Sequence, residues 1–359
     1  MLRAYKYRIY PNKKQQQAID QILETCRYLY NDFLYERKFM YGYDKTDITY
    51  SWQQNSLPMR KKLNAYLLQV HSQVLQDVAR RVDKAFKNFF RRVKAGETPG
   101  YPRFRSKGRY ESFTYPQSGY SLEGNKVKFS CIGSIKIKLH REIEGRIKTC
   151  TITRKNNKYY ACFACGVEKQ LLPDTGNFIG IDMGIADICV TSDEVFFPAP
   201  KTYRKAEKAL KKAQRKVSRR KKGGNRRKKA VGELARAHEK VASQRKDISH
   251  KIANELVKKY DIIAHEKLQI KNMVQNEHLA KSINDAGWGM FFGILAYKAE
   301  SAGRLVIEVD PKNTSQKCFS CGKLVQKKLS ERWHNCPYCG YSAHRDVNAA
   351  KNILKRAVA

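Results

Sequence analysis

The feature that most limits how this chain can fold is a group of four cysteines near its C-terminus. They form two Cys-x2-Cys pairs separated by 14 residues, and they are Cys318, Cys321, Cys336 and Cys339. Four thiolates at this spacing are the closed tetrahedral ligand set of structural zinc, with no position left for water. We therefore expect a structural Zn²⁺ in residues 313–341, with His334 and His344 as flanking residues outside the ligand set.

Another Cys-x2-Cys pair, Cys162 and Cys165, has a different explanation. It lies in a segment that alternates between apolar and polar residues, which predicts a strand. Residues three apart on a strand point to opposite faces. We expect these two cysteines to be packing residues and not metal ligands.

The charge of the chain indicates its partner. The 359 residues include 72 Lys and Arg against 33 Asp and Glu, a net charge of +39. Repulsion on this scale destabilises a compact protein unless a polyanion neutralises it, and nucleic acid is the obvious polyanion. A ribosomal RNA-binding protein has the same composition, so charge alone does not give the activity. The length favours two or three domains.

No run of about 18 apolar residues occurs, so no membrane span is expected. The first residues, MLRAYKYRIYP, lack the apolar stretch of a signal peptide. We expect a cytoplasmic protein of a prokaryotic cell, where DNA and RNA are directly accessible.

The first half of the chain contains one strand, a helical insert and then several strands. Residues 2–10 alternate with period two, which predicts a strand ended by Pro11. Apolar residues at helical spacing follow over 13–40 and again over 52–93. Short alternating segments through Val167 then predict an antiparallel barrel or sheet.

Aromatic and basic residues alternate in the segment that joins these parts. They are Tyr101, Arg103, Phe104, Arg105, Lys107, Arg109, Tyr110, Phe113 and Tyr115. The rings can stack on bases while the cations bind phosphates, or they can simply fill the core of the barrel. We favour nucleic-acid contact for the cationic face of the segment and leave both explanations open for single rings.

The second half carries a long basic segment. Glu207 is the only acid from Lys201 to Lys229, while a helical apolar stripe persists, so we expect a basic amphipathic helix. A hinge at Gly223–Asn225 and a return helix complete a hairpin over about 201–257. We expect nucleic-acid contacts from six cations near the hinge: Arg219, Arg220, Lys221, Lys222, Arg226 and Arg227.

Three acids stand out by their positions. Asp182 and Glu266 each end a short apolar strand, and Asp346 opens a terminal helix over 347–355. A helix over 283–302 and a strand over 304–309 lie between the last two acids. If these elements form one sheet with flanking helices, the carboxylates can converge, and such a cluster is suited to Mg²⁺ or Mn²⁺.

Two such ions can activate water and stabilise the leaving oxygen of a phosphodiester. Each acid taken alone is better explained as a surface carboxylate or helix cap. The three positions together favour a nuclease.

With these motifs in view, the chain resembles the TnpB family of transposon-associated RNA-guided DNA endonucleases, related to type V CRISPR effectors. The similarity extends over essentially the whole chain. It rests on five segments: MLRAYKYRIYPN, GIDMGIADICVTSD, IIAHEKLQIKNM, TSQKCFSCG with CPYCG, and HRDVNAAKNIL.

The resemblance implies a multidomain α+β protein with a wedge β-barrel, a helical recognition insert and a RuvC nuclease domain. RuvC has an RNase H-like α/β fold, here with an inserted zinc ribbon. The implied ranges are 1–10 for the first barrel strand, 11–96 for the recognition lobe, 97–172 for the barrel, 173–312 for RuvC, 313–341 for the zinc ribbon, and 342–359 for the last RuvC helix.

The family's catalytic acids correspond to Asp182, Glu266 and Asp346, and its zinc ligands to the four cysteines above. Two neighbours depart from the pattern, because Lys267 and His344 stand where relatives often have acids. Neither departure removes a member of the triad, so an active nuclease is implied.

The resemblance also implies a guide RNA derived from the transposon end and a double-stranded DNA target with a short adjacent motif. We expect the protein to act as a monomer with its RNA. Two other functions stay open: an RNA-guided repressor that binds DNA without cutting it, and an RNase H-like transposase that joins strands.

Overall fold

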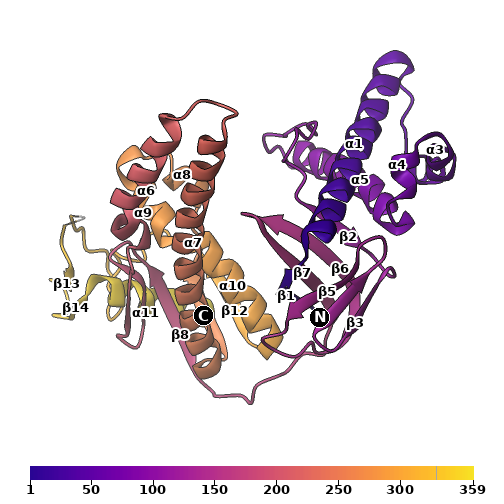
Figure 1. Cartoon of the computed structure of the whole chain (residues 1–359). Helices are drawn as coiled ribbons and strands as arrows, with labels where there is room; N and C mark the ends of the chain where they lie inside the picture. Colours follow the sequence, from indigo (N-terminus) through magenta and orange to yellow (C-terminus); the bar gives the residue numbers. More distant parts are fainter. Residues whose placement is uncertain (329) are drawn as a thin grey trace. The chain divides into compact units, whose positions relative to one another are not determined.

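The computed structural model describes residues 1–328 and 330–359. These residues form two compact units, Met1–Glu168 and Lys169–Ala359, each with its own hydrophobic core (Figure 1). Both units combine helices with a sheet, so the expected multidomain α+β class is confirmed. Among the described residues, no helix is long and apolar enough to cross a membrane.

The sheet of the first unit has seven antiparallel strands in the order β2-β6-β7-β1-β5-β4-β3. Their bounds are β1 (Leu2–Tyr10), β2 (Ser112–Tyr115), β3 (Tyr120–Glu123), β4 (Lys126–Phe129), β5 (Gly133–Lys138), β6 (Arg146–Lys155) and β7 (Lys158–Gly166). The order begins at β2 and ends at β3, so the described sheet is a curled half-barrel, which agrees in part with the expected antiparallel barrel or sheet. On β7, Cys165 is buried and Cys162 lies half-buried on the other face, as predicted.

The helices of the first unit follow β1. They are α1 (Lys13–Asp44), α2 (Tyr50–Asn55), α3 (Leu57–Leu63), α4 (Ala65–Leu68) and α5 (Ser72–Lys94). Asn12 and Gln15 form a reciprocal capping box at the start of α1, with bonds of 2.9 and 3.0 Å.

The helical region predicted over 52–93 is divided into four pieces. Pro58 is the second residue of α3, in the first turn where its missing N–H is tolerated, and the non-helical His71 precedes α5.

The rings of the aromatic and basic segment divide into a buried group and an exposed group. Tyr110, Phe113 and Tyr115 are buried in the core of the first unit. Tyr101 and Phe104 are exposed, and Lys38 Nζ lies 5.3 and 5.1 Å from their ring centroids. The exposed rings are therefore available to a partner, and the buried ones stabilise the fold.

The sheet of the second unit has five strands in the order β10-β9-β8-β11-β12. Their bounds are β8 (Phe178–Met183), β9 (Asp187–Thr191), β10 (Phe196–Pro198), β11 (Ile262–Glu266) and β12 (Leu305–Val309). β8, β9 and β10 are antiparallel neighbours, whereas β11 runs parallel to both β8 and β12. The carboxyl ends of β8 and β11 therefore meet at one edge of the sheet.

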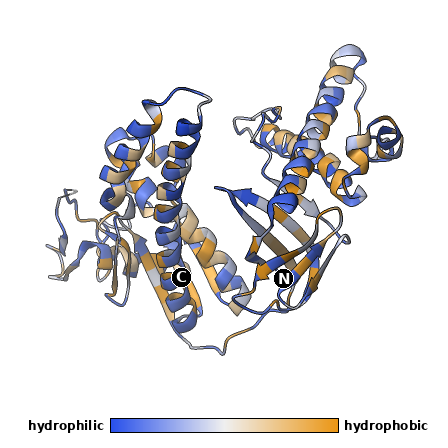
Figure 2. Ribbon diagram, in the orientation of Figure 1, coloured by the Kyte–Doolittle hydropathy of each residue, from blue (hydrophilic) through white to orange (hydrophobic). Residues whose placement is uncertain are grey.

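The helices of the second unit cover both faces of this sheet. They are α6 (Thr202–Ser218), α7 (Asn225–Lys259), α8 (Ile270–Met273), α9 (Glu277–Ala286), α10 (Trp288–Ala302) and α11 (Arg345–Val358). α7 and α10 pack on one face, against Ile179 and Ile181, and α11 packs on the other, against Ala264 (Figure 1). Figure 2 shows that α6 and α7 are mostly hydrophilic whereas α10 is largely hydrophobic.

The predicted helix over 283–302 is divided into α9 and α10. Gly287 separates them with φ 69°, a left-handed conformation that favours glycine. A Cβ at this position would also lie 2.8 Å from Cδ of Arg245. The hydrophobic pattern continues through Gly287, so it could not indicate this break.

We predict that Gly180→Ala destabilises the second unit. A Cβ on Gly180 would lie 2.1 Å from the Ala350 carbonyl oxygen and 2.8 Å from the Leu354 nitrogen of α11. The helix must move away from β8, at an expected cost of about 2–3 kcal/mol in the free energy of unfolding. Urea denaturation of the full chain measures this loss.

Gly293→Ala is the matched control, because nothing lies within 4 Å of a Cβ at this position on α10. It should be neutral or stabilising by up to about 1 kcal/mol. Equal stability of the Gly180 variant and wild type would contradict the tight packing of α11 on β8.

Candidate functional site

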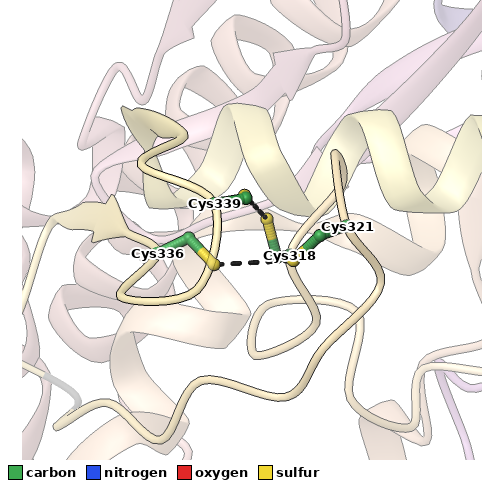
Figure 3. Close-up of side chains that lie close together, drawn as sticks. All are labelled: Cys318, Cys321, Cys336 and Cys339. Carbon is green, nitrogen blue, oxygen red and sulfur yellow. Dashed lines mark hydrogen bonds between the residues drawn. The ribbon is translucent and has the colours of Figure 1, made fainter.

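The four cysteines near the C-terminus converge from two loops (Figure 3). The Sγ atoms of Cys318 and Cys339 are 3.7 Å apart, those of Cys321 and Cys336 are 3.6 Å apart, and all four lie within 4.8 Å of one another. A tetrahedron with metal–sulfur bonds of about 2.3 Å has edges of about 3.8 Å. The thiols therefore fit a closed zinc site.

Each cysteine pair is presented by a tight turn that ends in glycine. The Gly322 and Gly340 N–H groups donate to the carbonyls of Cys318 and Cys336, at 2.9 and 3.0 Å. Both glycines have positive φ, 74° and 73°, which side chains disfavour. The repeated Cys-x2-Cys-Gly is thus a sequence signal for the turn as well as for the metal.

The two nearby histidines have other roles. His334 is fully buried, and its Nδ1 contacts Lys327 Nζ. His344 Nδ1 accepts a hydrogen bond of 3.3 Å from the Asp346 N–H and so caps α11. Within residues 1–328 and 330–359, the cysteines are the only group of three or more Cys, His, Asp or Glu whose ligand atoms lie so close together.

Two buried asparagines attach the start of the cysteine segment to α11. Asn348 accepts from the Phe319 N–H at 3.0 Å and donates to the Lys317 carbonyl at 2.9 Å. Asn352 donates to the carbonyls of Lys317 and Thr314, at 2.7 and 2.9 Å. The cysteine cluster is therefore fixed to α11, the helix that carries Asp346 in its first turn.

Asp182 and Glu266 occupy equivalent positions on adjacent parallel strands. The last register pair of β8 and β11 is Ile181 with His265, and the next residues along the strands are Asp182 and Glu266. Side chains alternate between faces, so both acids share the face of Gly180, against which α11 packs. The two carboxylates are thus brought to the same edge and face of the sheet.

Asp346 lies in the first turn of α11, above this face. The pKa of Asp182 is raised well above its usual value, first by burial and then by the negative charges of Glu266 and Asp346. A positive charge on Arg345 opposes this rise. Glu266 and Asp346 therefore both lie near enough to Asp182 to act on its charge, although the three acids are spaced more widely than the four thiols.

Glu266 has a hydroxyl partner that the sequence did not indicate. The Thr314 hydroxyl donates to Glu266 Oε1, and Thr314 is itself buried. Burial raises the pKa of Glu266, and this hydrogen bond partly offsets the rise. Thr314 lies 48 positions from Glu266, in a loop with no local pattern that could have predicted the contact.

Two arginines neutralise Asp346. Arg345 Nε lies 3.2 Å from Asp346 Oδ1, and an Arg332 guanidinium nitrogen lies 4.0 Å from Oδ2. Positive charge thus already lies beside the third acid of the cluster.

The predicted basic helix has a cationic surface. A groove of about 750 Å³ is lined by lysines and arginines of α6 together with Arg219 and Arg220. Lys221, Lys222 and Arg226 are exposed nearby. Arg227 differs, because its guanidinium donates to the carbonyls of Val217 and Arg220, at 2.8 and 3.2 Å, and so closes the helical hairpin.

The expected aromatic segment presents its cations outward in the first unit. Arg103, Arg105 and Arg109 are exposed beside Tyr101 and Phe104. The backbone of Arg105 is fixed to α1, since its N–H donates to Asn31 Oδ1 at 2.8 Å. This segment is thus an anchored surface of rings and positive charges.

We predict that Cys318→Ser removes about one zinc per chain and lowers the stability of the second unit. A closed thiolate site contributes its binding energy to folding, and serine is a poor replacement ligand. Metal analysis of the purified protein, together with thermal unfolding, measures both effects. Cys162→Ser is the control and should retain full zinc. Full zinc in the Cys318 variant would contradict the assigned ligand set.

Comparison with known families adds an independent observation. The OrfB_IS605 family profile, described as a probable transposase, matches residues 162–277, and the Cas12f1-like TNB domain profile matches 288–353. A helix-turn-helix profile of OrfB_IS605 matches residues 1–45. Those residues form strand β1 and the single continuous helix α1, instead of two helices joined by a turn.

Two solved structures share the fold at low sequence identity. The mini-RNA-guided endonuclease CRISPR-Cas_phi3 aligns with a TM-score of 0.52 and 9% identity, covering 100% of this chain and 92% of the other. CasPhi-2 (Cas12j) bound to crRNA aligns with a TM-score of 0.51 and 11% identity, covering 100% and 98%.

Two curated relatives match over nearly their whole length. InsQ of Escherichia coli, named a putative RNA-guided DNA endonuclease, is 29% identical over 374 residues, covering 98% of this chain and 92% of its own. A Streptomyces pristinaespiralis protein with the same functional name is 31% identical over 366 residues, covering 99% and 90%. The chain therefore belongs to the OrfB_IS605 family of TnpB-like proteins, as its sequence motifs predict.

Proposed function

We propose that this chain is a transposon-encoded, RNA-guided DNA endonuclease, with Asp182, Glu266 and Asp346 as its single nuclease site. The observation that carries the proposal is the register of β8 and β11, which puts Asp182 beside Glu266 on the face covered by the Asp346 helix. The names of the full-length relatives support the same activity. The double-stranded target would be cut next to a short adjacent motif.

The second unit is proposed to contain a RuvC domain of RNase H-like fold. Its support is the sheet order, in which an antiparallel group of three strands continues into two parallel ones. In this assignment, 173–312 and 342–359 form RuvC and 313–341 the zinc ribbon. Residues 1–10 and 97–172 form the wedge, and 11–96 the recognition lobe.

The three acids fit a divalent cation by their chemistry. Carboxylate oxygens are preferred ligands of Mg²⁺ and Mn²⁺, and burial together with the charges of Glu266 and Asp346 raises the pKa of Asp182, so a cation at this position would be stabilising. When bound, two such ions would supply an activated water and stabilise the leaving oxygen of the phosphodiester. Thr314 would orient Glu266, and Arg345 would balance the charge of Asp346.

Recognition of sequence is assigned to a guide RNA. The net charge of +39 and the cationic groove along α6 fit a nucleic-acid backbone. In an RNA-guided nuclease, base pairing reads the target and the protein reads backbone shape and the adjacent motif. The exposed Tyr101, Phe104 and neighbouring arginines would add backbone and stacking contacts in the first unit.

We predict that Asp182→Asn abolishes cleavage of both DNA strands while leaving binding of matched DNA intact. A single carboxylate site would serve both strands, and the cationic surfaces that bind nucleic acid lie elsewhere. The assay uses the RNA that copurifies with the protein, an end-labelled duplex matched to it, and Mg²⁺. Binding is measured beside it in chelator.

Glu308→Gln is the matched control. Glu308 lies on the same sheet and pairs in register with His265, so its side chain points to the opposite face from Glu266. This variant should cut at the wild-type rate. Cleavage of one strand by the Asp182 variant would reveal a second nuclease site. If the wild-type protein joined DNA strands instead of cutting them, the result would favour a transposase.

We predict that Thr314→Val raises the Mg²⁺ concentration needed for half-maximal cleavage by about tenfold. Loss of a group that orients a metal ligand typically weakens metal affinity or activity by about 10–100-fold. Valine keeps the shape of threonine but removes the hydroxyl, whereas Thr314→Ser retains it and should recover most of the affinity. An unchanged Mg²⁺ titration for the valine variant would exclude Thr314 as a positioning residue.

A further inference from the structure

We propose that Trp333, His344 and Phe196 form a platform that stacks on an unpaired nucleobase of the DNA strand delivered to the three acids. The inference rests on the proposed nuclease function and adds a substrate subsite to it. The platform lies entirely in the second unit, and three strands contribute one ring each.

The three rings are contiguous. Trp333 and His344 are directly opposite each other on the two-stranded sheet of β13 (Trp333–Asn335) and β14 (Ser342–His344). Their ring centroids are 6.2 Å apart at an interplanar angle of 74°. Phe196, on β10, lies 5.1 Å from His344 at 81°. His344 thus links two rings that come from different sheets.

The outer rings are exposed to solvent. Trp333 is 60% exposed and Phe196 is 40% exposed. Single exposed aromatic residues are common, but exposed rings that touch one another present a joint apolar face that a partner can cover. The flat partner that fits a patch of rings on a strongly cationic protein is a nucleobase, since every base has a stacking face.

The platform is held at a fixed offset from the proposed nuclease site. His344 is two residues before Asp346, and its Nδ1 accepts from the Asp346 N–H. The turn before Phe196 is attached to the same helix, because Lys351 Nζ of α11 lies 3.0 Å from Glu194 Oε1. A base bound on these rings would therefore lie at a set distance from the carboxylate that opens α11.

Positive charge next to the rings completes the fit to a polynucleotide strand. Arg332, which precedes Trp333, lines a cavity of about 330 Å³ together with Lys201 and Arg204. The cavity also contains Asp285, whose carboxylate already accepts from the Tyr203 N–H at 2.9 Å and contacts Arg245 at 3.1 Å. Arg332 also lies 4.0 Å from Asp346, so the positive charge left for a backbone phosphate comes from Lys201 and Arg204.

Tryptophan fluorescence of the full chain tests the stacking directly. The chain has three tryptophans, and Trp288 is only 3% exposed, with its indole N–H donating to the Gly184 carbonyl at 3.2 Å. In a Trp52→Phe background, Trp333 is therefore the exposed indole. The protein is titrated in chelator with oligo(dT) and with an abasic strand of the same length and charge, and binding is followed by anisotropy.

We expect oligo(dT) to quench the Trp333 emission and the abasic strand to bind without quenching it. The double variant Trp52→Phe, Trp333→Phe retains only the emission of Trp288. In this variant, oligo(dT) and the abasic strand should have the same effect on fluorescence. Full emission from Trp333 with oligo(dT) bound would overturn the proposal and leave a protein surface as the explanation of the patch. Stronger quenching by oligo(rU) than by oligo(dT) would overturn the assignment to the DNA strand.

Cleavage by the guide-loaded protein provides a second readout. Trp333→Ala should lower the cleavage rate about tenfold, as expected for the loss of one stacked base, with DNA binding in chelator unchanged. Trp333→Phe should recover most of the rate. Tyr338→Ala is the control, because Tyr338 is also 60% exposed on the cysteine module but lies beside Lys323, at 4.6 Å.

A wild-type cleavage rate for Trp333→Ala would overturn the role of the platform in delivering the strand. The fluorescence measurement uses no metal and no cleavage, so its result is independent of the nuclease assignment. Failure of wild type to cut would count against the proposed function, and failure to quench would count against the platform.

Discussion

Helix α11 lies so close to β8 that a Cβ on Gly180 would meet the Ala350 carbonyl oxygen at 2.1 Å. This contact determines where Asp346 lies, since Asp346 is one helical turn before Ala350 on the same helix. The cysteine module is attached to the same helix, because Asn348 and Asn352 of α11 donate hydrogen bonds to the backbone just before Cys318. Zinc at the four thiols would therefore stabilise the helix that presents Asp346 to the sheet.

The clustered acids and the positive surfaces of this chain lie in different places, which bears on its function. A protein with a net charge of +39 brings three of its few acids to one edge of one sheet, where burial and mutual repulsion raise the pKa of Asp182. Such an arrangement costs folding free energy, and a structural role alone would be met better by apolar residues. The cost is understandable if the acids bind cations for chemistry, while the positive surfaces of α6 and the first unit bind the nucleic acid.

The parts of the site that could be predicted from the sequence are those with a local pattern. The ribbon spacing of the four thiols predicts their convergence, and the ends of two apolar strands predict that Asp182 and Glu266 lie side by side, because cysteine turns and strand ends are short-range features. Thr314 could not be predicted, since its bond to Glu266 depends on how a loop 48 residues away folds back. Arg227 was grouped with nucleic-acid contacts because a cation in a basic run gives no sign that it closes a hairpin. The break at Gly287 was hidden by an apolar pattern that continues through it.

Asp182, Glu266 and Asp346 are proposed to hold divalent metal together. Crystals of the full chain soaked in Mn²⁺ and measured at the manganese absorption edge test it most directly, and zinc at the four cysteines serves as an internal reference at its own edge. We expect anomalous scattering from manganese between the three carboxylates, and we expect this signal to be lost in crystals of Asp182→Asn. Manganese bound elsewhere, with none at these carboxylates, would contradict it.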